Sequence, residues 1–388
     1  MIFVIADDFS GAAEIAGIGL RYGLKCSLQT ELNWAGKPDL LILDTDTRSL
    51  PESNALRKLS NIIDQLPDRS FDWLYKKIDS VLRGHVMAEI RLVMNKLDIE
   101  TAVIIAPNPS AGRTIRGGYY YINGIPLDKT GFAYDPEYPA GSADVRILLD
   151  LPGEAPASYS DEIKDALFPG IIVGGVRSRD DAHRWAESIP DDALPAGSSE
   201  FFENLLEIRG YKPATDDNIK RFGWHGKHLV VLGSAGGNLD ENIKRLTSMG
   251  FVVCRWPGSH ADLEKPEYLE HWIEAVERAF KERDHVVLTT GLPLNTLAGL
   301  PKKIAHLTAV AVKRICSLQK IRFLFIAGGA TAAHIIRELG WKYMRPVLEF
   351  STGVVALRAS EKDDLTIIVK PGSYPWPAFD FLNSQKGE

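Results

Sequence analysis

Short apolar runs recur along this chain, and each is followed by a polar turn and then by an amphipathic segment. The first run, Ile2–Ala6, is apolar throughout, as expected of a strand that is buried on both faces. The next segment, about residues 12–22, has the apolar spacing of a helix and is followed by Gly23 as a stop. Alternating strands and helices of this length predict parallel βαβ units. We therefore expect an α/β fold.

The chain has 388 residues, which is more than one ordinary hydrophobic core accommodates. The strand-helix alternation stops near residue 210 and restarts near residue 227, and residues 211–226 are rich in Pro, Asp and Gly. We expect one domain over residues 1–210, a linker over 211–226 and a second domain over 227–388. Each domain should hold a largely parallel sheet flanked by helices, with an active-site cleft between the two.

The net charge of −6 gives no overall basic footprint for nucleic acid, although a local site can still bind a small anion. The first apolar run is too short for a signal peptide or a membrane span. Cys26, Cys254 and Cys316 lie far apart and form no CxxC pair, which favours reduced thiols in the cytoplasm. His225 and His228 form an HxxH, but solvent-facing linker histidines are the commoner explanation, so no metal site is predicted.

Residues 75–89, YKKIDSVLRGHVMAE, combine the end of a strand with the start of a helix. Side chains alternate faces along a strand, so Lys77 and Asp79 should point to one face and Lys76 to the other. Lys77, Asp79, Ser80 and Arg83 then fall at or beyond the carboxyl end of the strand, where open α/β sheets bind small ligands. The cations suit the carboxylate of a small hydroxylated acid and Asp79 suits its hydroxyls. A polar loop with a surface ion pair is the alternative.

Three more strands should deliver polar loops to the same edge of the sheet, at residues 7–10, 44–48 and 108–113. Beyond them, GGYYYINGIPLDKT alternates aromatic and apolar residues around Asn123 and Gly124, which predicts a β-hairpin. The segment from about 115 to 153 is either a flap beside the site or a plain connection.

The second half carries glycine-rich strand-to-helix turns at residues 233–237 and 328–329. Open N–H groups at a helix N-terminus suit phosphate, and glycine lets the anion approach closely. No GxxxxGK[ST] motif is present, so a nucleotide would use another geometry. As an alternative, residues 230–255 resemble a loose Rossmann half with Arg255 placed for the 2′-phosphate of NADP, although the glycine spacing does not fit GxGxxG.

Five motifs occur in the order found in one family: ADDFSGAAE, KKIDSVLRG, APNPSAGRT, GSAGG and AGGATA. In these motifs the chain resembles the four-carbon acid sugar kinases, which include threonate, erythronate and 3-oxo-tetronate kinases. The resemblance spans nearly the whole chain. It implies an N-terminal domain that binds a short sugar acid, a C-terminal domain that binds ATP, and Mg²⁺ as a further cofactor.

Carried over residue by residue, the resemblance implies two sets of site residues. Those on the sugar-acid side are Asp7, Asp8, Lys77, Asp79, Ser80, Arg83, Asn108 and Arg113. Those on the nucleotide side are Ser234, Gly328, Gly329, Thr331, Gly353 and Gly372.

Three departures from the family pattern lie on the nucleotide side: Ala330 replaces an acidic residue, and the segments 350–354 and 370–375 differ from the family's glycine motifs. We expect ATP-dependent phosphorylation of a sugar-acid hydroxyl, with Arg83 and Lys77 clamping the carboxylate and either Asp8 or Asp79 as the base. An NADP-dependent hydroxy-acid oxidoreductase and a non-catalytic or degenerate sugar-acid-binding relative are the alternatives. The sequence does not fix the sugar, the phosphorylated hydroxyl or the oligomeric state, although a homodimer is compatible with it.

Overall fold

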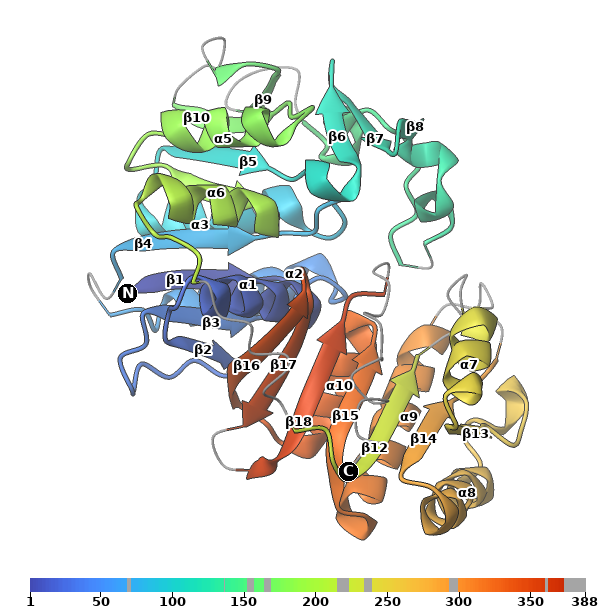
Figure 1. Cartoon of the computed structure of the whole chain (residues 1–388). Coiled ribbons are helices and arrows are strands. Elements are labelled where there is room, and N and C mark those ends of the chain that lie inside the picture. The colour runs from blue at the N-terminus through green and yellow to red at the C-terminus, as the bar shows by residue number, and fades with distance from the viewer. Residues whose placement is uncertain are drawn as a thin grey trace. The chain divides into compact units, whose positions relative to one another are not determined.

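The computed structural model describes residues 1–67, 71–135, 137–151, 157–163, 169–214, 223–233, 239–292, 299–359 and 362–372. Two compact units divide the chain, Met1–Ala214 and Thr215–Glu388. Each unit contains a sheet with helices packed against it (Figure 1), which confirms the predicted fold class of two α/β domains. Half of the expected linker, residues 215–222, lies outside the described residues.

The N-terminal unit is built on a parallel sheet in the order β2-β3-β1-β4-β11-β5-β10-β9. Its main strands are continuous apolar runs, as the sequence predicted. The strands are β1 (Ile2–Ala6), β2 (Cys26–Gln29), β3 (Leu40–Asp44), β4 (Trp73–Lys77), β5 (Thr101–Ile105), β9 (Ala157–Ser160), β10 (Gly170–Gly174) and β11 (Leu194–Gly197). The helices are α1 (Phe9–Arg21), α2 (Glu52–Ile63), α3 (Val86–Leu97), α4 (Val145–Leu148), α5 (Arg179–Ser188) and α6 (Ser199–Ile208).

Helices cover both faces of this sheet, with α1, α5 and α6 in front of the strands in Figure 1. On the other face, apolar side chains of β1, β3 and β4 pack with α2 and α3 in one buried cluster that includes Phe3, Leu41, Leu59, Leu74 and Ile90. Burying a side chain of this size contributes roughly 1.5–3 kcal/mol each. This packing fixes the strands whose carboxyl ends carry the polar loops.

Strand β11 was not expected from the sequence. Its four residues contain Pro195, and such a short run with proline is a weak strand signal. It nevertheless lies between β4 and β5 and pairs in parallel with both. A Cβ on Gly197 would stand 2.1 Å from the carbonyl oxygen of Ile105, so only glycine allows this close approach.

The predicted hairpin is present as β7 (Tyr119–Ile122) and β8 (Ile125–Pro126). Asn123 and Gly124 both have positive φ, 50° and 80°, as a tight two-residue turn requires. β6 (Arg113–Arg116) completes a separate three-stranded antiparallel sheet, and Ile115 forms a bridge to Val176 of the main unit. Ile115 and Tyr120 are buried in the core cluster of α2 and α3.

The C-terminal unit has the strand order β13-β14-β12-β15-β18-β17-β16. The first five strands in that order are parallel, and β17 pairs antiparallel with both β18 and β16. The strands are β12 (Lys227–Leu232), β13 (Val252–Arg255), β14 (His285–Thr289), β15 (Ile321–Ala327), β16 (Tyr343–Ser351), β17 (Val354–Ala359) and β18 (Lys362–Lys370). The helices are α7 (Leu239–Ser248), α8 (Pro266–Glu282), α9 (Leu300–Leu318) and α10 (Gly329–Leu339).

This strand order contradicts the Rossmann alternative. In a Rossmann half the first strand lies next to the second, which places the residue after the second strand beside the ribose. Here β14 lies between β12 and β13. The end of β13 is therefore one strand further from the end of β12 than in a Rossmann half. Arg255 instead lies against Gly291, where an added Cβ would be 3.0 Å from an Arg255 Nη atom.

Among the described residues, no helix is long and apolar enough to cross a membrane.

Candidate active site

The polar loops that follow β1, β3 and β4 meet at one edge of the N-terminal sheet. Ala6 at the end of β1 pairs with Asp44 of β3 and with Lys77 of β4, so the next residues of all three loops emerge side by side. The side chains that meet there are Asp7, Asp8, Arg48, Asp79 and Arg83, and we call these five residues the rim cluster.

Arg48 lies at the centre of the rim cluster. Its Nε and Nη2 donate to the two carboxylate oxygens of Asp7 at 2.8 and 2.7 Å, in a bidentate pair. Nη2 also donates to Asp8 Oδ1 at 2.7 Å, and Nη1 lies 3.6 Å from Asp79 Oδ1. A Cβ on Gly84, whose φ is +88°, would lie 2.9 Å from Arg48 Cγ. The glycine of the LRG motif therefore leaves room for this arginine.

Asp79 and Arg83 form a second bidentate pair, with Nε to Oδ2 and Nη2 to Oδ1 both at 2.9 Å. The backbone N–H groups of Val81 and Arg83 also donate to Asp79 Oδ2. The third nitrogen of the guanidinium, Nη1, donates to Asp135 at 2.8 Å. Asp79 is thus held by several donors from its own loop.

The rim carboxylates differ in pKa because burial and the arginines oppose one another. Burial raises the pKa of Asp7, and the attraction of Arg48 only partly offsets it. Burial also opposes ionisation of Asp8, but Arg48 and Lys77 outweigh it and hold the pKa of Asp8 below its usual value. For Asp79, Arg83 and Arg48 outweigh burial by far, so its pKa lies well below the usual range. The Asp8 and Asp79 side chains are therefore ionised at neutral pH.

The two lysines of the KKIDS segment point to opposite faces of the sheet, as strand alternation predicted. Lys76 pairs with Glu89 of α3 at 2.8 Å, and both side chains are buried. Lys77 Nζ donates to the carbonyl of Ile78 at 2.9 Å and lies 3.8 Å from Glu14 of α1. Lys77 therefore supports the face on which α1 begins, next to Asp8.

The loop after β5 reaches the same edge. An Nη atom of Arg113 donates to the hydroxyl of Ser80, so this loop touches the one that carries Asp79. Asn108 is buried, and its side-chain oxygen has no hydrogen-bond partner among the described residues. A buried acceptor without a partner costs free energy unless a ligand satisfies it.

On the nucleotide side, α10 begins directly after Gly328. Gly328 has φ +101° and ψ 130° at the N-cap, and within the described part of the chain no side chain caps the first turn of the helix. A Cβ on Gly233 would lie 2.7 Å from the Thr331 hydroxyl, so the end of β12 fits closely against α10 only as glycine. These residues fit a phosphate group, because open N–H groups and the helix dipole both favour an anion.

The other predicted nucleotide residues lie at the same edge of the C-terminal sheet. The N–H of Gly328 donates to the carbonyl of Lys370, and Gly372 follows two residues later. Gly353 has φ +80° in the turn between β16 and β17, and Val355 just after it pairs with Val369. Burial lowers the pKa of Lys370 to about 8. The remaining predicted residue, Ser234, lies outside the described residues.

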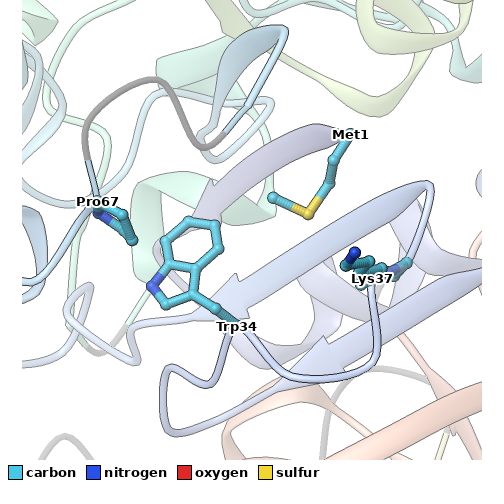
Figure 2. Close-up of a pocket in the computed structure, with 5 residues that line it drawn as sticks. Met1, Trp34, Lys37 and Pro67 are labelled. Carbon is cyan, nitrogen blue, oxygen red and sulfur yellow. The ribbon is translucent and has the colours of Figure 1, made fainter.

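A cavity of about 390 Å³ lies at the opposite end of the N-terminal sheet, and Figure 2 shows the side chains around it. Met1, Trp34, Lys37, Pro38 and Pro67 line it, and Met1 precedes β1 whereas the rim cluster follows it. The lining residues that the structure describes are largely apolar and include no carboxylate. The cavity therefore does not provide the groups that phosphoryl transfer needs.

Comparison with protein families matches the two halves separately. Residues 2–159 match a sugar-binding N-terminal domain, and residues 229–374 match a nucleotide-binding C-terminal domain. The chain belongs to the four-carbon acid sugar kinase family. By family it is therefore an enzyme of the sugar-acid kinase class, and the order of the two matched domains is the one that the motifs implied.

Named relatives cover nearly the full length. The chain is 26% identical to a D-threonate kinase of Salmonella typhimurium, over 96% of this chain and 95% of the relative. It is 22% identical to a 3-oxo-tetronate kinase of Haemophilus influenzae, over 96% and 97% respectively. Over a shorter region, 36% of this chain and 33% of the relative, it is 31% identical to a D-erythronate kinase of Heliobacterium modesticaldum.

Solved structures agree on the fold. The Haemophilus influenzae protein HI1011 superposes with a TM-score of 0.70 at 20% identity, covering 99% of each chain. A Salmonella typhimurium protein superposes with a TM-score of 0.78 at 18% identity, covering 99% of this chain and 98% of the other. At this identity the likeness concerns the fold alone.

Two members of the site were not predicted from the sequence. Arg48 stood in a loop that was expected at this edge, but no motif separated it from its polar neighbours. Asp135 lies 52 residues beyond Arg83. The apolar residues around it are spaced as in neither a strand nor a helix, so the direction of its side chain could not be predicted. Only the folded chain brings this carboxylate to the rim cluster.

Proposed function

We propose that this protein phosphorylates a hydroxyl group of a four-carbon sugar acid, with ATP as the phosphate donor. The observation that carries the proposal is the rim cluster, where carboxylates and arginines from three parallel strand ends meet in a sugar-binding domain. The named relatives support threonate, erythronate or 3-oxo-tetronate as the substrate class.

We assign the two substrates to the two expected domains, the sugar acid to residues 1–210 and the nucleotide to 227–388. Arg83 and Lys77 are the cations proposed to bind the acid's carboxylate, with Ser80, Asn108 and Arg113 around its hydroxyls. The unpartnered oxygen of Asn108 supports this, since a sugar hydroxyl would donate to it. Asp7 would act through Arg48, because its bidentate pair orients the guanidinium toward Asp8.

Asp8 is the better candidate for the base. Asp79 Oδ2 accepts from the Arg83 Nε and from two backbone N–H groups, and its Oδ1 accepts from Arg83 Nη2. Asp8 Oδ2, by contrast, accepts only from the hydroxyl of Ser10 among the hydrogen bonds described for it, and its side chain is 16% exposed against 8% for Asp79. A hydroxyl donor can rotate away, so Asp8 can accept a substrate proton. Asp79 then holds Arg83 in place.

The proposed transfer forms a bond between the substrate hydroxyl oxygen and the terminal phosphorus, while the bond from that phosphorus to the ADP oxygen breaks. The hydroxyl proton passes to Asp8. Phosphoryl transfer depends mainly on positioning and charge neutralisation, and ATP supplies the phosphoryl group when bound. On the protein side, the open first turn of α10 with Gly328, Gly329 and Thr331 would hold phosphate oxygens.

Mg²⁺ is part of the proposal. Among the described residues, no group of three His, Cys, Asp or Glu side chains could hold a metal ion alone. The ion would bind mainly to phosphate oxygens and to one carboxylate of the rim. Ala330 does not weaken the phosphate contact, because the N–H groups of the first turn do not depend on the side chain at this position.

Two finer points extend the proposal. The cytoplasm, with its ATP and reducing conditions, suits a chain whose Cys26 and Cys254 are thiols. A homodimer is proposed as the assembly, and sedimentation of the purified chain would test it.

The test is release of ADP by the purified full-length chain with ATP and Mg²⁺ and a panel of acids: D-threonate, D-erythronate and 3-oxo-tetronate. The neutral polyols threitol and erythritol are the matched controls, since they carry a hydroxymethyl group where threonate and erythronate carry the carboxylate. We expect substrate-dependent ADP release with at least one acid and none with the polyols. If none of the acids causes ADP release, although ATP stabilises the protein against heat, the proposed substrate class is wrong.

A further inference from the structure

One segment of the N-terminal unit contacts the rim cluster from outside the parallel sheet. It follows the hairpin and comprises residues 130–135 and 137–138, which we call the strap. Its Phe132 ring lies 5.4 Å from the Arg83 guanidinium carbon and 5.8 Å from that of Arg113. Glu137 accepts from the Ser49 hydroxyl at 2.6 Å, and Tyr138 donates to the carbonyl of Arg48. These contacts favour the first of the two options that the sequence left open, a flap beside the site.

Asp135 is the strap residue that pairs with a rim cation. Its Oδ1 accepts from the backbone N–H groups of Glu137 and Tyr138 at 3.0 and 2.8 Å, which closes a local turn. Its Oδ2 accepts from Arg83 Nη1 at 2.8 Å. Oδ1 therefore stabilises the strap, whereas Oδ2 binds the guanidinium of Arg83.

The guanidinium of Arg83 presents two edges, each suited to one carboxylate. Asp79 takes the edge formed by Nε and Nη2 with both of its oxygens. The adjacent edge, formed by Nη1 and the second hydrogen of Nη2, is bound by Asp135 through one oxygen only. A carboxylate that took both donors of this edge would make one more charge-assisted hydrogen bond than Asp135 does.

The two pairs also differ in exposure. The Asp79 side chain is 8% exposed, whereas Asp135 is 17% and Arg83 28% exposed. Partly exposed ion pairs contribute little net free energy, so the outer pair is the one that another carboxylate can replace. The inner pair stays because Asp79 also accepts from its own loop.

We propose that Asp135 is an internal stand-in for the substrate's carboxylate, which a bound sugar acid displaces from Arg83. This inference rests on the proposed function. It makes Asp135 a specificity-determining residue. A ligand pairs with Arg83 only if its carboxylate binds the guanidinium more tightly than Asp135 does. A neutral polyol of the same length does not replace it.

The matching experiment is titration calorimetry of the full chain with D-threonate and D-erythronate, comparing wild type with Asp135→Asn. The amide keeps the Oδ1 acceptor for the strap's turn and removes the charge that competes for Arg83. We expect the variant to bind the better acid about tenfold more tightly, a change of ~1.4 kcal/mol. Its affinity for erythritol should stay unchanged.

Glu137→Gln is the matched control, since it removes the same charge from the same strap but from a residue that accepts from Ser49. It should leave acid affinity within about twofold, which separates a specific effect at Arg83 from a general loss of negative charge. Asp135→Glu, which restores a carboxylate, should return affinity toward wild type. Thermal melting of each variant checks that it folds.

Equal or weaker acid binding by folded Asp135→Asn would overturn the inference. If wild type binds and phosphorylates an acid in that case, the proposed function stands and only the stand-in role fails. If neither protein binds any acid, both the proposed function and the inference are wrong. Equal tightening by Glu137→Gln would also refute the role of Asp135, since charge alone would then explain the effect.

Discussion

The two units expose opposite kinds of site at the carboxyl ends of their parallel strands. In the N-terminal unit the groups are charged side chains, and each arginine of the rim cluster is held by at least two carboxylates. In the C-terminal unit they are mostly backbone groups at glycines, and no described side chain caps the first turn of α10. A site made of side chains depends on residue identity, whereas a site made of backbone depends on conformation. The two should therefore respond to mutation in different ways.

The largest effect should come from the proposed base. We expect Asp8→Asn to lower kcat by roughly 10²–10⁴, because the amide cannot accept the hydroxyl proton. Steady-state ADP release with saturating acid measures the loss. Asp64→Asn, which removes an exposed carboxylate that pairs with Lys96, is the control and should keep full activity. Wild-type turnover in Asp8→Asn would remove Asp8 from the role.

Loss of the central arginine should cost stability. Arg48→Met leaves three neighbouring carboxylates without their shared cation, and removing one partner of a buried ionic cluster costs about 3–5 kcal/mol. Urea unfolding at pH 7 measures the difference. The deficit should shrink as the pH falls toward 4, because Asp7, whose pKa is raised by burial, becomes protonated and no longer needs the cation. A deficit that is the same at both pH values would argue against this explanation.

In the C-terminal unit, backbone conformation should matter more than charge. Gly328→Ala forces a Cβ onto a residue with φ +101°, which we expect to cost roughly 1–3 kcal/mol and to weaken ATP binding. Gly141→Ala is the control, since nothing lies within 4 Å of the added Cβ and its φ is ordinary. Unfolding curves and ATP titrations of both variants give the comparison. Equal effects at the two positions would mean that the conformation of Gly328 is not special.

The smallest effect concerns a buried histidine pair in the C-terminal unit. His228 stacks on His285 at 4.6 Å, and neither ring nitrogen of His228 has a hydrogen-bond partner among the described residues. Burial, with His285 and His225 nearby, lowers the pKa of His228 to about 3. The unfolded chain binds this proton near pH 6.5, so stability is complete above that pH and is lost as the pH falls from about 6.5 toward 3.

Between pH 7 and pH 6, His228 should reduce the free energy of unfolding by about 0.7 kcal/mol. His228→Leu removes this proton-binding site and should flatten that part of the pH dependence, as urea unfolding at the two pH values will show. If the free energy of unfolding changes as much between the two pH values in the variant as in wild type, groups other than His228 cause the pH dependence.

The same contrast explains how far the sequence could be interpreted. Ile2–Ala6 and Leu40–Asp44 are apolar runs whose pattern alone predicts buried parallel strands, and the structure agrees. Lys77, Asp79 and Arg83 were placed at a strand end by local spacing. β11 was missed because four residues with a proline carry too little periodicity, and its place comes from pairing with two strands more than 80 residues away. Arg48 and Asp135 were missed because their partners are set by long-range packing.

The most direct test of the account is a crystal structure of the chain with a four-carbon sugar acid bound. We predict that a substrate hydroxyl lies within hydrogen-bond distance of Asp8, that the acid's carboxylate contacts Arg83 or Lys77, and that Asp79 keeps its bidentate pair. An acid that binds elsewhere, or one whose hydroxyls do not approach Asp8, would contradict the account.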